Sequence, residues 1–167
     1  IAGKSPTFGL PVPCRKTKAK EMKPRCALLL LACAISPVAK AEFQAGAVAL
    51  EVTPKQLPVL VNGGFLSRSA TGVTDPIYAK ALVLADGKTE IAIVVVDSCM
   101  MPRPLLDKAK AKAAKLTGIP SNRILISATH THTAPSTLAC LGTKADPRYT
   151  PYLVGKITEA IADAQKK

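Results

Sequence analysis

His130 and His132 are the two histidines of this chain, and they lie two positions apart in the segment ILISATHTHTAPS. Residues i and i+2 of an extended segment point the same way. Both imidazoles can therefore approach one centre, or divide the work between a metal and a substrate. Neutral imidazole is a favoured zinc ligand, and catalytic zinc sites usually combine three protein ligands with a water. The pair indicates half of a zinc site, whose other ligands would be carboxylate, cysteine or tyrosine side chains.

A His-x-His pair is a weak signal by itself, because a single histidine is more often a hydrogen-bonded loop residue near a sheet edge. Here the pair directly follows an expected buried strand at 123–127. Threonines surround it at positions 129, 131 and 133, and Pro135 turns the chain soon afterwards. This context favours a functional interpretation of both histidines.

Asp97 is expected on the same rim of the sheet as the histidines. Residues 91–97 and 123–127 are two apolar strands with a helix between them, so they predict a βαβ unit with parallel strands. Functional groups of such sheets gather beyond the carboxyl ends of the strands. Two roles stay open for Asp97: it orients a histidine through the ring N–H, or it caps the turn before the helix. Ser98 and Ser136 lack the surroundings of a catalytic nucleophile.

The remaining elements predict an α/β fold, with a mixed sheet, a βαβ unit and helices packed on the outside, forming a partial domain. Residues 77–84 and 89–96 flank Asp86-Gly87 and predict an antiparallel hairpin. Residues 45–52 predict a further strand, and 58–74 predict a glycine-containing loop. The first helix is bounded by Pro104 and Gly118, and a last helix is expected at 151–164, capped by Thr150.

Both helices have an apolar side. In the first helix it consists of Leu105, Leu106, Ala109, Ala113 and Leu116, and in the last helix of Leu153, Val154, Ile157, Ala160 and Ile161. The first helix also carries lysines at 108, 110, 112 and 115. These lysines could make transient contact with an anionic membrane surface, although a lysine-rich face is typical of an ordinary solvated helix.

The segment ILISATHTHTAPS resembles the ISGTHTHSGPGG-type signature of the neutral or alkaline, non-lysosomal ceramidases, in their N-terminal catalytic domain. The segment AGAVALEVTP also resembles the strand of that family that leads into an Asp-Ile-Thr-Pro motif, with Glu51-Val52 in place of Asp-Ile. NGGF and ALVLADGKTEIAIVVVD resemble the glycine-containing loop and the strand pair that follow. The resemblance extends over residues 45–166.

This resemblance implies a zinc-dependent amide hydrolase that converts N-acylsphingosine to sphingosine and a fatty acid. It implies that His130 is a zinc ligand and that His132 hydrogen-bonds the substrate or the oxygen that develops charge. Residues 133–136, Thr-Ala-Pro-Ser, replace the Ser-Gly-Pro-Gly of the family. The family takes another histidine, a glutamate and a tyrosine as ligands from regions beyond Lys167, so we expect a truncated N-terminal part. The alternative is a non-catalytic exported α/β module that retains a partial metal site.

The first 41 residues indicate export. From Met22 the sequence has the layout of a secretory signal peptide: Lys23 and Arg25, an apolar run at 26–35, and Ala39-Lys40-Ala41 before an expected cleavage. The run is shorter than the ~20 residues of a spanning helix. We therefore expect a signal peptide at 22–41 and a periplasmic or secreted protein. Residues 1–21 are expected to be an upstream, non-native extension. A less favoured interpretation is a lipoprotein acylated at Cys33.

Composition argues against a nucleic-acid partner. The formal net charge is +12, but eight Lys and Arg against Glu21 fall in the first 41 residues, and the remainder has only a mild positive excess. Three Phe and three Tyr are scattered without the clustered basic face that nucleic-acid binding needs. Cys99 and Cys140 could pair in an exported protein, but we expect them to be independent, with Cys99 a small buried residue at a strand end. Nothing here predicts an oligomeric state.

Overall fold

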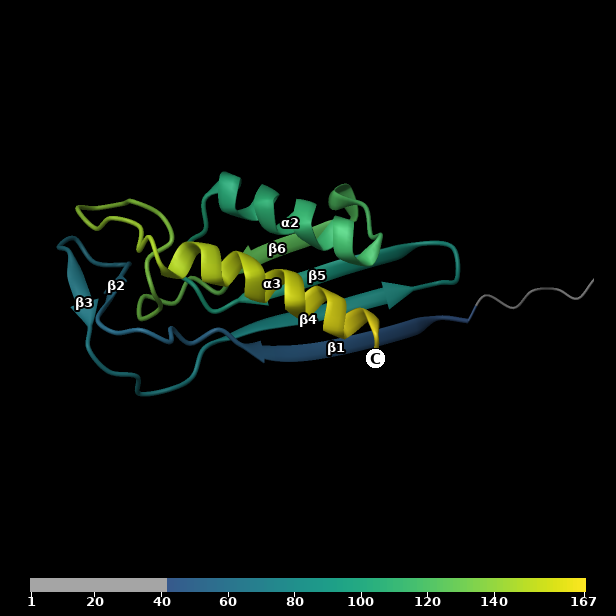
Figure 1. Ribbon diagram of the computed structural model, residues 1–167, viewed down its shortest axis with the longest axis horizontal. Coiled ribbons are helices and arrows are strands. Elements are labelled where there is room, and N and C mark those ends of the chain that lie inside the picture. Colours follow the sequence, from purple (N-terminus) through teal and green to yellow (C-terminus); the bar gives the residue numbers. More distant parts are fainter. Residues whose placement is uncertain (1–41) are drawn as a thin grey trace, which may run out of the picture. The chain divides into compact units, whose positions relative to one another are not determined.

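The structure is a computed structural model that describes residues 42–167, so the signal peptide expected at 22–41 and the extension expected at 1–21 lie outside the described residues. Figure 1 shows a single sheet beside two helices and a smaller strand pair at one end. The strands are β1 (Gln44–Glu51), β2 (Val59–Val61), β3 (Arg68–Ala70), β4 (Tyr78–Ala85), β5 (Glu90–Val96) and β6 (Ile124–Ala128). The helices are α2 (Arg103–Thr117), the short 3-10 helix η1 (Ser121–Arg123) and α3 (Tyr149–Gln165).

The main sheet has four strands in the order β1-β4-β5-β6. β1 and β5 both run antiparallel to β4, and β6 runs parallel to β5. The predicted hairpin is confirmed: Asp86 Oδ1 accepts hydrogen bonds from the N–H groups of Lys88 at 2.9 Å and Thr89 at 2.7 Å. The predicted parallel pair with α2 in its crossover is also confirmed. The carboxyl ends of β5 and β6 therefore meet at one edge, where the predicted site residues begin.

The helices form where the sequence predicted them, but the burial of one residue of α2 and the capping residue of α3 differ from the prediction. α2 ends at Gly118, whose φ of 79° is the left-handed conformation that glycine adopts at low cost. Leu116 was expected on the buried side but is 63% exposed, and the buried residues of α2 are Leu105, Ala109 and Ala113. α3 begins at Tyr149, and Asp146 rather than Thr150 accepts the free N–H groups of its first turn.

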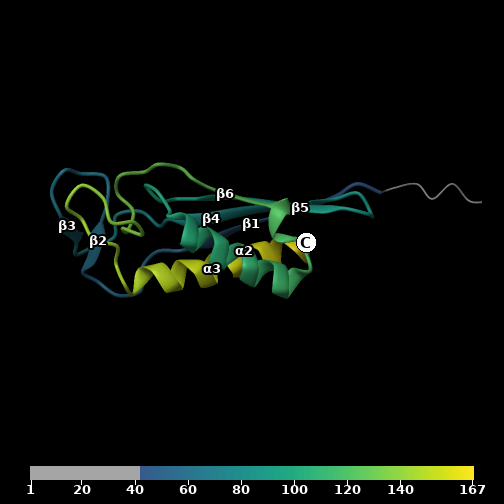
Figure 2. The same cartoon turned by 90° about the horizontal axis from the view of Figure 1, so that it is seen from above.

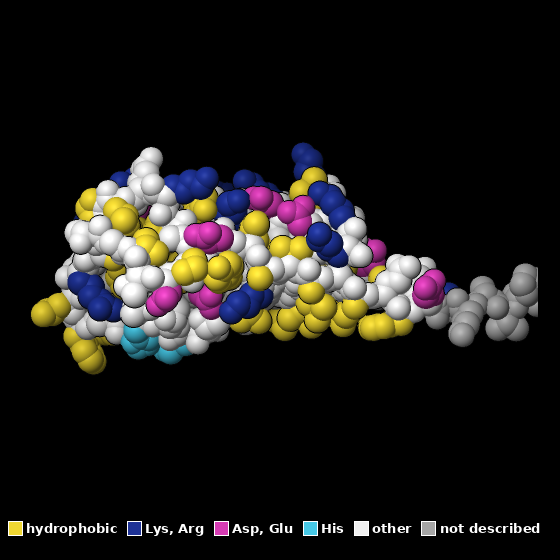
Figure 3. All heavy atoms as spheres, turned by 90° about the horizontal axis from the view of Figure 1, so that it is seen from below, with side chains coloured by type: hydrophobic (Ala, Val, Ile, Leu, Met, Phe, Trp, Pro, Cys, Tyr) yellow, Lys and Arg dark blue, Asp and Glu magenta, His cyan; other side chains and the backbone are white. Residues whose placement is uncertain are grey.

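The core lies between the helices and one face of the sheet (Figure 2). Side chains alternate along each strand, and the inward ones include Ala81, Val83, Val94, Val96 and Ile126. They pack against the apolar sides of the two helices, and all the residues predicted for α3 are buried. Figure 3 shows a row of apolar side chains on the side of the sheet away from the helices, with the histidines at one end. Ile91, Val95 and Leu125 are exposed apolar residues of these strands.

The stretch expected to be a loop contains a small strand pair. β2 and β3 pair antiparallel, with Val59 opposite Ala70 and Val61 opposite Arg68. An isolated bridge joins Val61 to Pro135, five residues after the first histidine. The strands are only three residues long, too short for an alternation pattern to be visible in sequence. Within residues 42–167, no helix is long and apolar enough to cross a membrane.

Candidate metal centre

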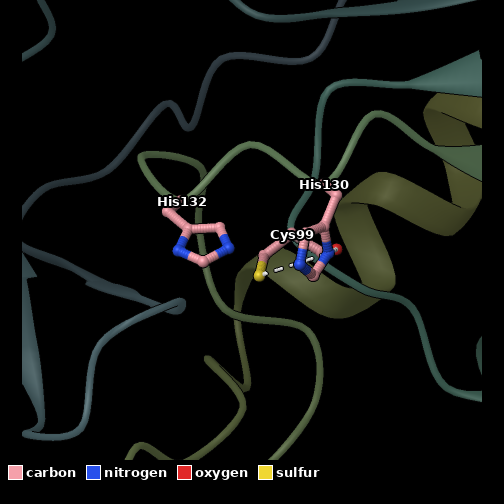
Figure 4. A group of neighbouring side chains, drawn as sticks. All are labelled: Cys99, His130 and His132. Carbon is pink, nitrogen blue, oxygen red and sulfur yellow. Dashed lines mark hydrogen bonds between the residues drawn. The ribbon is translucent and has the colours of Figure 1, made fainter.

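The two histidines lie in the loop that follows β6, and both are exposed. Their ring centroids are 4.8 Å apart and their planes meet at 80°. Figure 4 shows His130 and His132 on one side of this loop, with the side chain of Cys99 between them. The two imidazoles lie close together, but not because the segment is extended as the sequence suggested: His130 has a φ of 64° and His132 lies in a turn.

His130 has a backbone conformation that is unusual for a residue with a side chain. Its φ is 64°, in the left-handed region that non-glycine residues rarely occupy. Its Nδ1 lies 2.7 Å from the carbonyl oxygen of Cys99, which accepts a hydrogen bond when Nδ1 carries the proton. The N–H of Thr129 also donates to Val96 O at 2.9 Å, extending the pairing between the strands. Strain of this kind persists where the surroundings fix it, often at functional sites.

Cys99 is a member of the site that the sequence did not assign. It is 2% exposed, and its Sγ lies 4.0 Å from His130 Nδ1. The potential ligand atoms of Cys99, His130 and His132 all lie within 4.8 Å of one another, so this group could hold a metal ion. Cys99 and Cys140 are both free cysteines in the structure. Burial, and then Cys140, raise the pKa of the Cys99 thiol, so the thiol is neutral at pH 7 without a cation beside it.

Asp97 contacts neither a histidine nor the start of α2, as its two predicted roles would require, but residues of β4. Its Oδ2 accepts a hydrogen bond from the N–H of Tyr78 at 2.9 Å and lies 3.8 Å from Lys80 Nζ. The carbonyl of Cys99 takes the place beside the His130 ring that the first role gave to Asp97. The residue before α2 that begins the helix is Pro102, without a side-chain cap. Asp97 thus fixes the start of β4 against the end of β5.

The His132 side of the loop is held by β2, β3 and the segment between them. Arg68 Nη2 donates to the carbonyl oxygen of His132. The ring of His132 lies directly against Gly63, where an added Cβ would be 2.5 Å from His132 Cγ. Asn62 Nδ2 donates to Leu138 O at 2.8 Å, further along the same loop. These contacts join segments about seventy residues apart in sequence.

Asp146 connects this loop to the start of α3. Its N–H donates to Ser136 O at 2.8 Å, and the N–H of Ser136 donates to Leu60 O at 2.7 Å. Its carboxylate accepts from the N–H groups of Leu60 at 3.3 Å, Arg148 at 3.0 Å and Tyr149 at 3.1 Å. Burial alone would raise the pKa of Asp146. These N–H groups and the Arg148 guanidinium outweigh burial and lower it below 3.8.

The two serines considered as nucleophiles are structural. Ser98 is 1% exposed and its Oγ donates to Met100 O at 3.4 Å. Ser136 is fully buried and its Oγ donates to Leu138 O at 3.2 Å. Neither hydroxyl contacts a histidine in the part of the chain that the structure describes. Their exclusion as nucleophiles agrees with the sequence.

A pocket of about 490 Å³ opens beside the histidine loop. Thr133 and Pro135 form one wall, and β2, β3 and the segment before β4 form the others. Its lining mixes apolar side chains, such as Val59, Val61 and Ile77, with the polar Arg68 and Thr53. Pockets of about 300–1,000 Å³ with such a lining are typical of small-molecule sites.

Comparison with solved structures finds the same fold in part of a larger protein. Neutral ceramidase from Pseudomonas aeruginosa superimposes with a TM-score of 0.65 at 19% sequence identity, over 75% of this chain and 22% of that chain. This chain has the fold of part of neutral ceramidase. A ceramidase in complex with C2 gives a TM-score of 0.64 at 20% identity, over 75% of this chain and 21% of that one. The ceramidase fold expected from the histidine segment is confirmed.

No family model and no curated protein sequence matches this chain. The chain spans about a fifth of the length of the ceramidases it superimposes on. At identities of 19% and 20% the likeness concerns the fold. Activity therefore has to be argued from the side chains of the site.

Proposed function

We propose that this chain carries the metal-binding part of a zinc-dependent amide hydrolase of neutral ceramidase type. Its substrate would be an N-acyl sphingoid lipid, cleaved to a sphingoid base and a fatty acid. One observation carries the proposal: potential metal-binding side chains converge at the carboxyl ends of β5 and β6, in a fold shared with part of neutral ceramidase. The proposed hydrolysis would therefore take place at the group formed by Cys99, His130 and His132.

The donor set suits zinc. Two imidazoles and one thiol lie in the group, and zinc prefers nitrogen and sulfur ligands, whereas magnesium and calcium prefer oxygen. His130 is the proposed ligand. Its Nδ1 faces the Cys99 carbonyl, which leaves Nε2 for the ion and matches the usual arrangement in which a ligating histidine donates its other N–H to a carbonyl. When bound, zinc supplies a Lewis acid that activates water and polarises the amide carbonyl.

His132 is the proposed substrate-facing residue. It is exposed, it stands against the His130 ring, and the residues that follow it line the pocket. A ring N–H of His132 directed at the amide oxygen would stabilise the charge that develops there during attack. Arg68 and Gly63 hold this residue in place from the other side.

The lipid class is supported by the surroundings of the site. The pocket beside residues 133–135 is partly apolar, and the uncovered side of the sheet ends near the histidines (Figure 3). An acyl chain is favoured in such a place because burial releases about 25 cal/mol per Å² of apolar area. The ceramidase complexed with C2 belongs to the same fold. Export through residues 22–41 is part of the proposal and would give access to lipid outside the cytosol.

A second candidate is a non-catalytic exported module that keeps a partial metal site. The uncovered apolar side of the sheet favours it, because Ile91, Val95 and Leu125 remain 37%, 36% and 58% exposed. Contiguous exposed apolar surface of this kind is typical of a site that binds another protein or a membrane. The two candidates differ in whether the chain by itself cleaves an amide.

The test is hydrolysis of a short-chain N-acylsphingosine by the purified chain with one equivalent of zinc. Fatty acid release should exceed that of His130→Ala by at least about a hundredfold, because removing the ligand removes the activated water. Lys108→Ala, at an exposed position of α2 away from the histidine loop, serves as the control for activity and folding. If the parent chain binds zinc but releases no fatty acid, the enzyme proposal is refuted and the non-catalytic module is favoured.

A further inference from the structure

Cys99 brings a sulfur to the point where the two imidazoles meet. The ligand atoms of Cys99, His130 and His132 are within 4.8 Å of one another. The Cys99 Sγ is 4.0 Å from Nδ1 of His130, the ring nitrogen that faces the Cys99 carbonyl, while Nε2 is the one assigned to the ion. In a tetrahedral zinc site, the donor atoms lie about 3.5 Å apart, given metal–ligand distances of about 2.0–2.3 Å. The 4.8 Å limit on the separations within this group is only somewhat larger than that spacing.

We propose that the Cys99 thiolate is a direct ligand of the ion that His130 binds. This inference rests on the proposed metal site. The proposed hydrolysis does not itself require a sulfur ligand, because it needs only an ion bound by His130. Figure 4 shows the sulfur on the same side as the His130 ring and facing His132. His132 lies in the same group and is free to bind either the ion or the substrate oxygen. The ion would thus have a sulfur and a nitrogen from adjacent strand ends.

The backbone around Cys99 is fixed from three directions. The Cys99 carbonyl contacts His130 Nδ1 at 2.7 Å, and the hydroxyl of Thr137 donates to Met100 O at 2.7 Å. Val96, three residues earlier, pairs with Ala128 at the end of the parallel ladder. The sulfur is therefore positioned by both strands and by the histidine loop. A ligand placed in advance loses less conformational entropy when the ion arrives.

The net charge of the loaded site and the metal preference of sulfur donors both support Cys99 as a ligand. Ligation forms a bond from sulfur to the ion and releases the thiol proton to solvent. The thiolate and two neutral imidazoles would leave a dication with a net charge of about +1, less costly beside the buried Cys99 than the bare ion. No carboxylate belongs to this group of residues in the described chain. A sulfur and nitrogen donor set favours zinc, cobalt or cadmium over magnesium, calcium or manganese.

Cobalt(II) reports the bond directly, because a thiolate ligand gives an intense near-ultraviolet charge-transfer band that imidazole and water do not give. The full chain would be titrated with Co²⁺ under a phosphine reductant. Because the chain has five cysteines, the background variant carries Cys14→Ser, Cys26→Ser, Cys33→Ser and Cys140→Ser, which leaves Cys99. We expect the band in this background and in its His132→Ala derivative, and its loss in Cys99→Ser. We also expect Cys99→Ser to bind Zn²⁺ at least about tenfold more weakly.

The outcomes separate this inference from the proposed function. Co²⁺ or Zn²⁺ binding that depends on His130, without a charge-transfer band and unchanged in Cys99→Ser, would overturn the sulfur ligand and leave the histidine site standing. A band with no amide hydrolysis would support the ligand and count against the enzyme. Circular dichroism of Cys99→Ser checks folding. If that variant is unfolded, Cd²⁺ absorption by the background variant decides, since a cadmium–thiolate band is expected there and its absence contradicts the proposal.

Discussion

Gly63 leaves the space that the His132 ring occupies. A Cβ at Gly63 would lie 2.5 Å from Cγ and 2.6 Å from Cβ of His132, closer than real side chains approach one another. Gly63 also has a φ of 99°, which strongly favours glycine. This single position therefore ties the segment between β2 and β3 to the geometry of the metal centre.

Gly63→Ala should displace His132 and weaken the site. We expect amide hydrolysis by the zinc-loaded chain to fall by about tenfold or more, because the ring that faces the substrate oxygen is displaced. Gly64→Ala is the matched control, because its nearest neighbour would be Leu66 O at 3.6 Å, an ordinary contact. Fatty acid release from a short-chain N-acylsphingosine measures this effect. Equal losses in both variants would show that the ring contact is not what matters.

Asp146 should make the stability of the chain depend on acid. Because the pKa of its carboxyl is lower in the folded chain than 3.8, the unfolded chain binds the proton more tightly. Its contribution to the free energy of unfolding is therefore fully present above about pH 4, and is lost as pH falls through the lowered pKa. Urea unfolding from pH 6 to pH 2.5 measures this loss.

In Asp146→Asn this carboxylate no longer titrates, so part of the acid dependence should disappear. The variant should also lose about 1–2 kcal/mol at pH 7, the usual magnitude for a capping residue. Asp107→Asn, at an exposed carboxylate on α2, is the control and should keep the acid slope. An acid slope in Asp146→Asn as steep as in the parent would refute the assignment.

The uncovered side of the sheet should bind an apolar dye. Leu125 is 58% exposed there, whereas Leu116 is 63% exposed on α2. Leu125→Lys should reduce the fluorescence of bound anilinonaphthalene sulfonate, and Leu116→Lys should not. Both should change the free energy of unfolding by less than about 0.5 kcal/mol, since neither side chain is in the core. Equal dye binding by all three proteins would mean that the face is covered in solution.

Asp97 should act on folding rather than on the metal. Its carboxylate holds the N–H of Tyr78 and faces Lys80. Asp97→Ala should lower the free energy of unfolding by about 1–2 kcal/mol, through the hydrogen bond to a charged acceptor. Zinc affinity should stay within about twofold of the parent. A large loss of zinc affinity in a folded variant would restore the first role considered for Asp97, the orientation of a histidine through its ring N–H.

The sequence predicted the main sheet because its signals are local. The Asp86-Gly87 turn, the continuous apolar strand before Asp97 and the glycine after α2 each specify an element without help from the rest of the chain. The rim location of His130 and His132 followed from the parallel strand pair. These inferences needed only periodicity and topology.

The missed features depend on contacts between distant segments. β2 and β3 are three residues each, and Val61 of β2 also forms a bridge to Pro135 in the distant histidine loop. Asp146, which caps α3, precedes the residues whose periodicity predicted the helix, and its carboxylate also accepts a hydrogen bond from the N–H of Leu60. Cys99 was seen as a small buried residue, although its position two residues after Asp97, on the same rim, was a signal available in the sequence. A carbonyl acceptor for His130 has no side-chain signature at all.

Zinc binding to the apo chain tests the central claim most directly, because the proposed chemistry depends on an ion at His130. Titration calorimetry of the parent and of His130→Ala, both shown to be folded by circular dichroism, is the measurement. The parent is predicted to bind one zinc per chain at this site, and His130→Ala is predicted to lose that binding event. A parent without stoichiometric zinc, or a His130→Ala variant that binds zinc as tightly as the parent, would contradict the account.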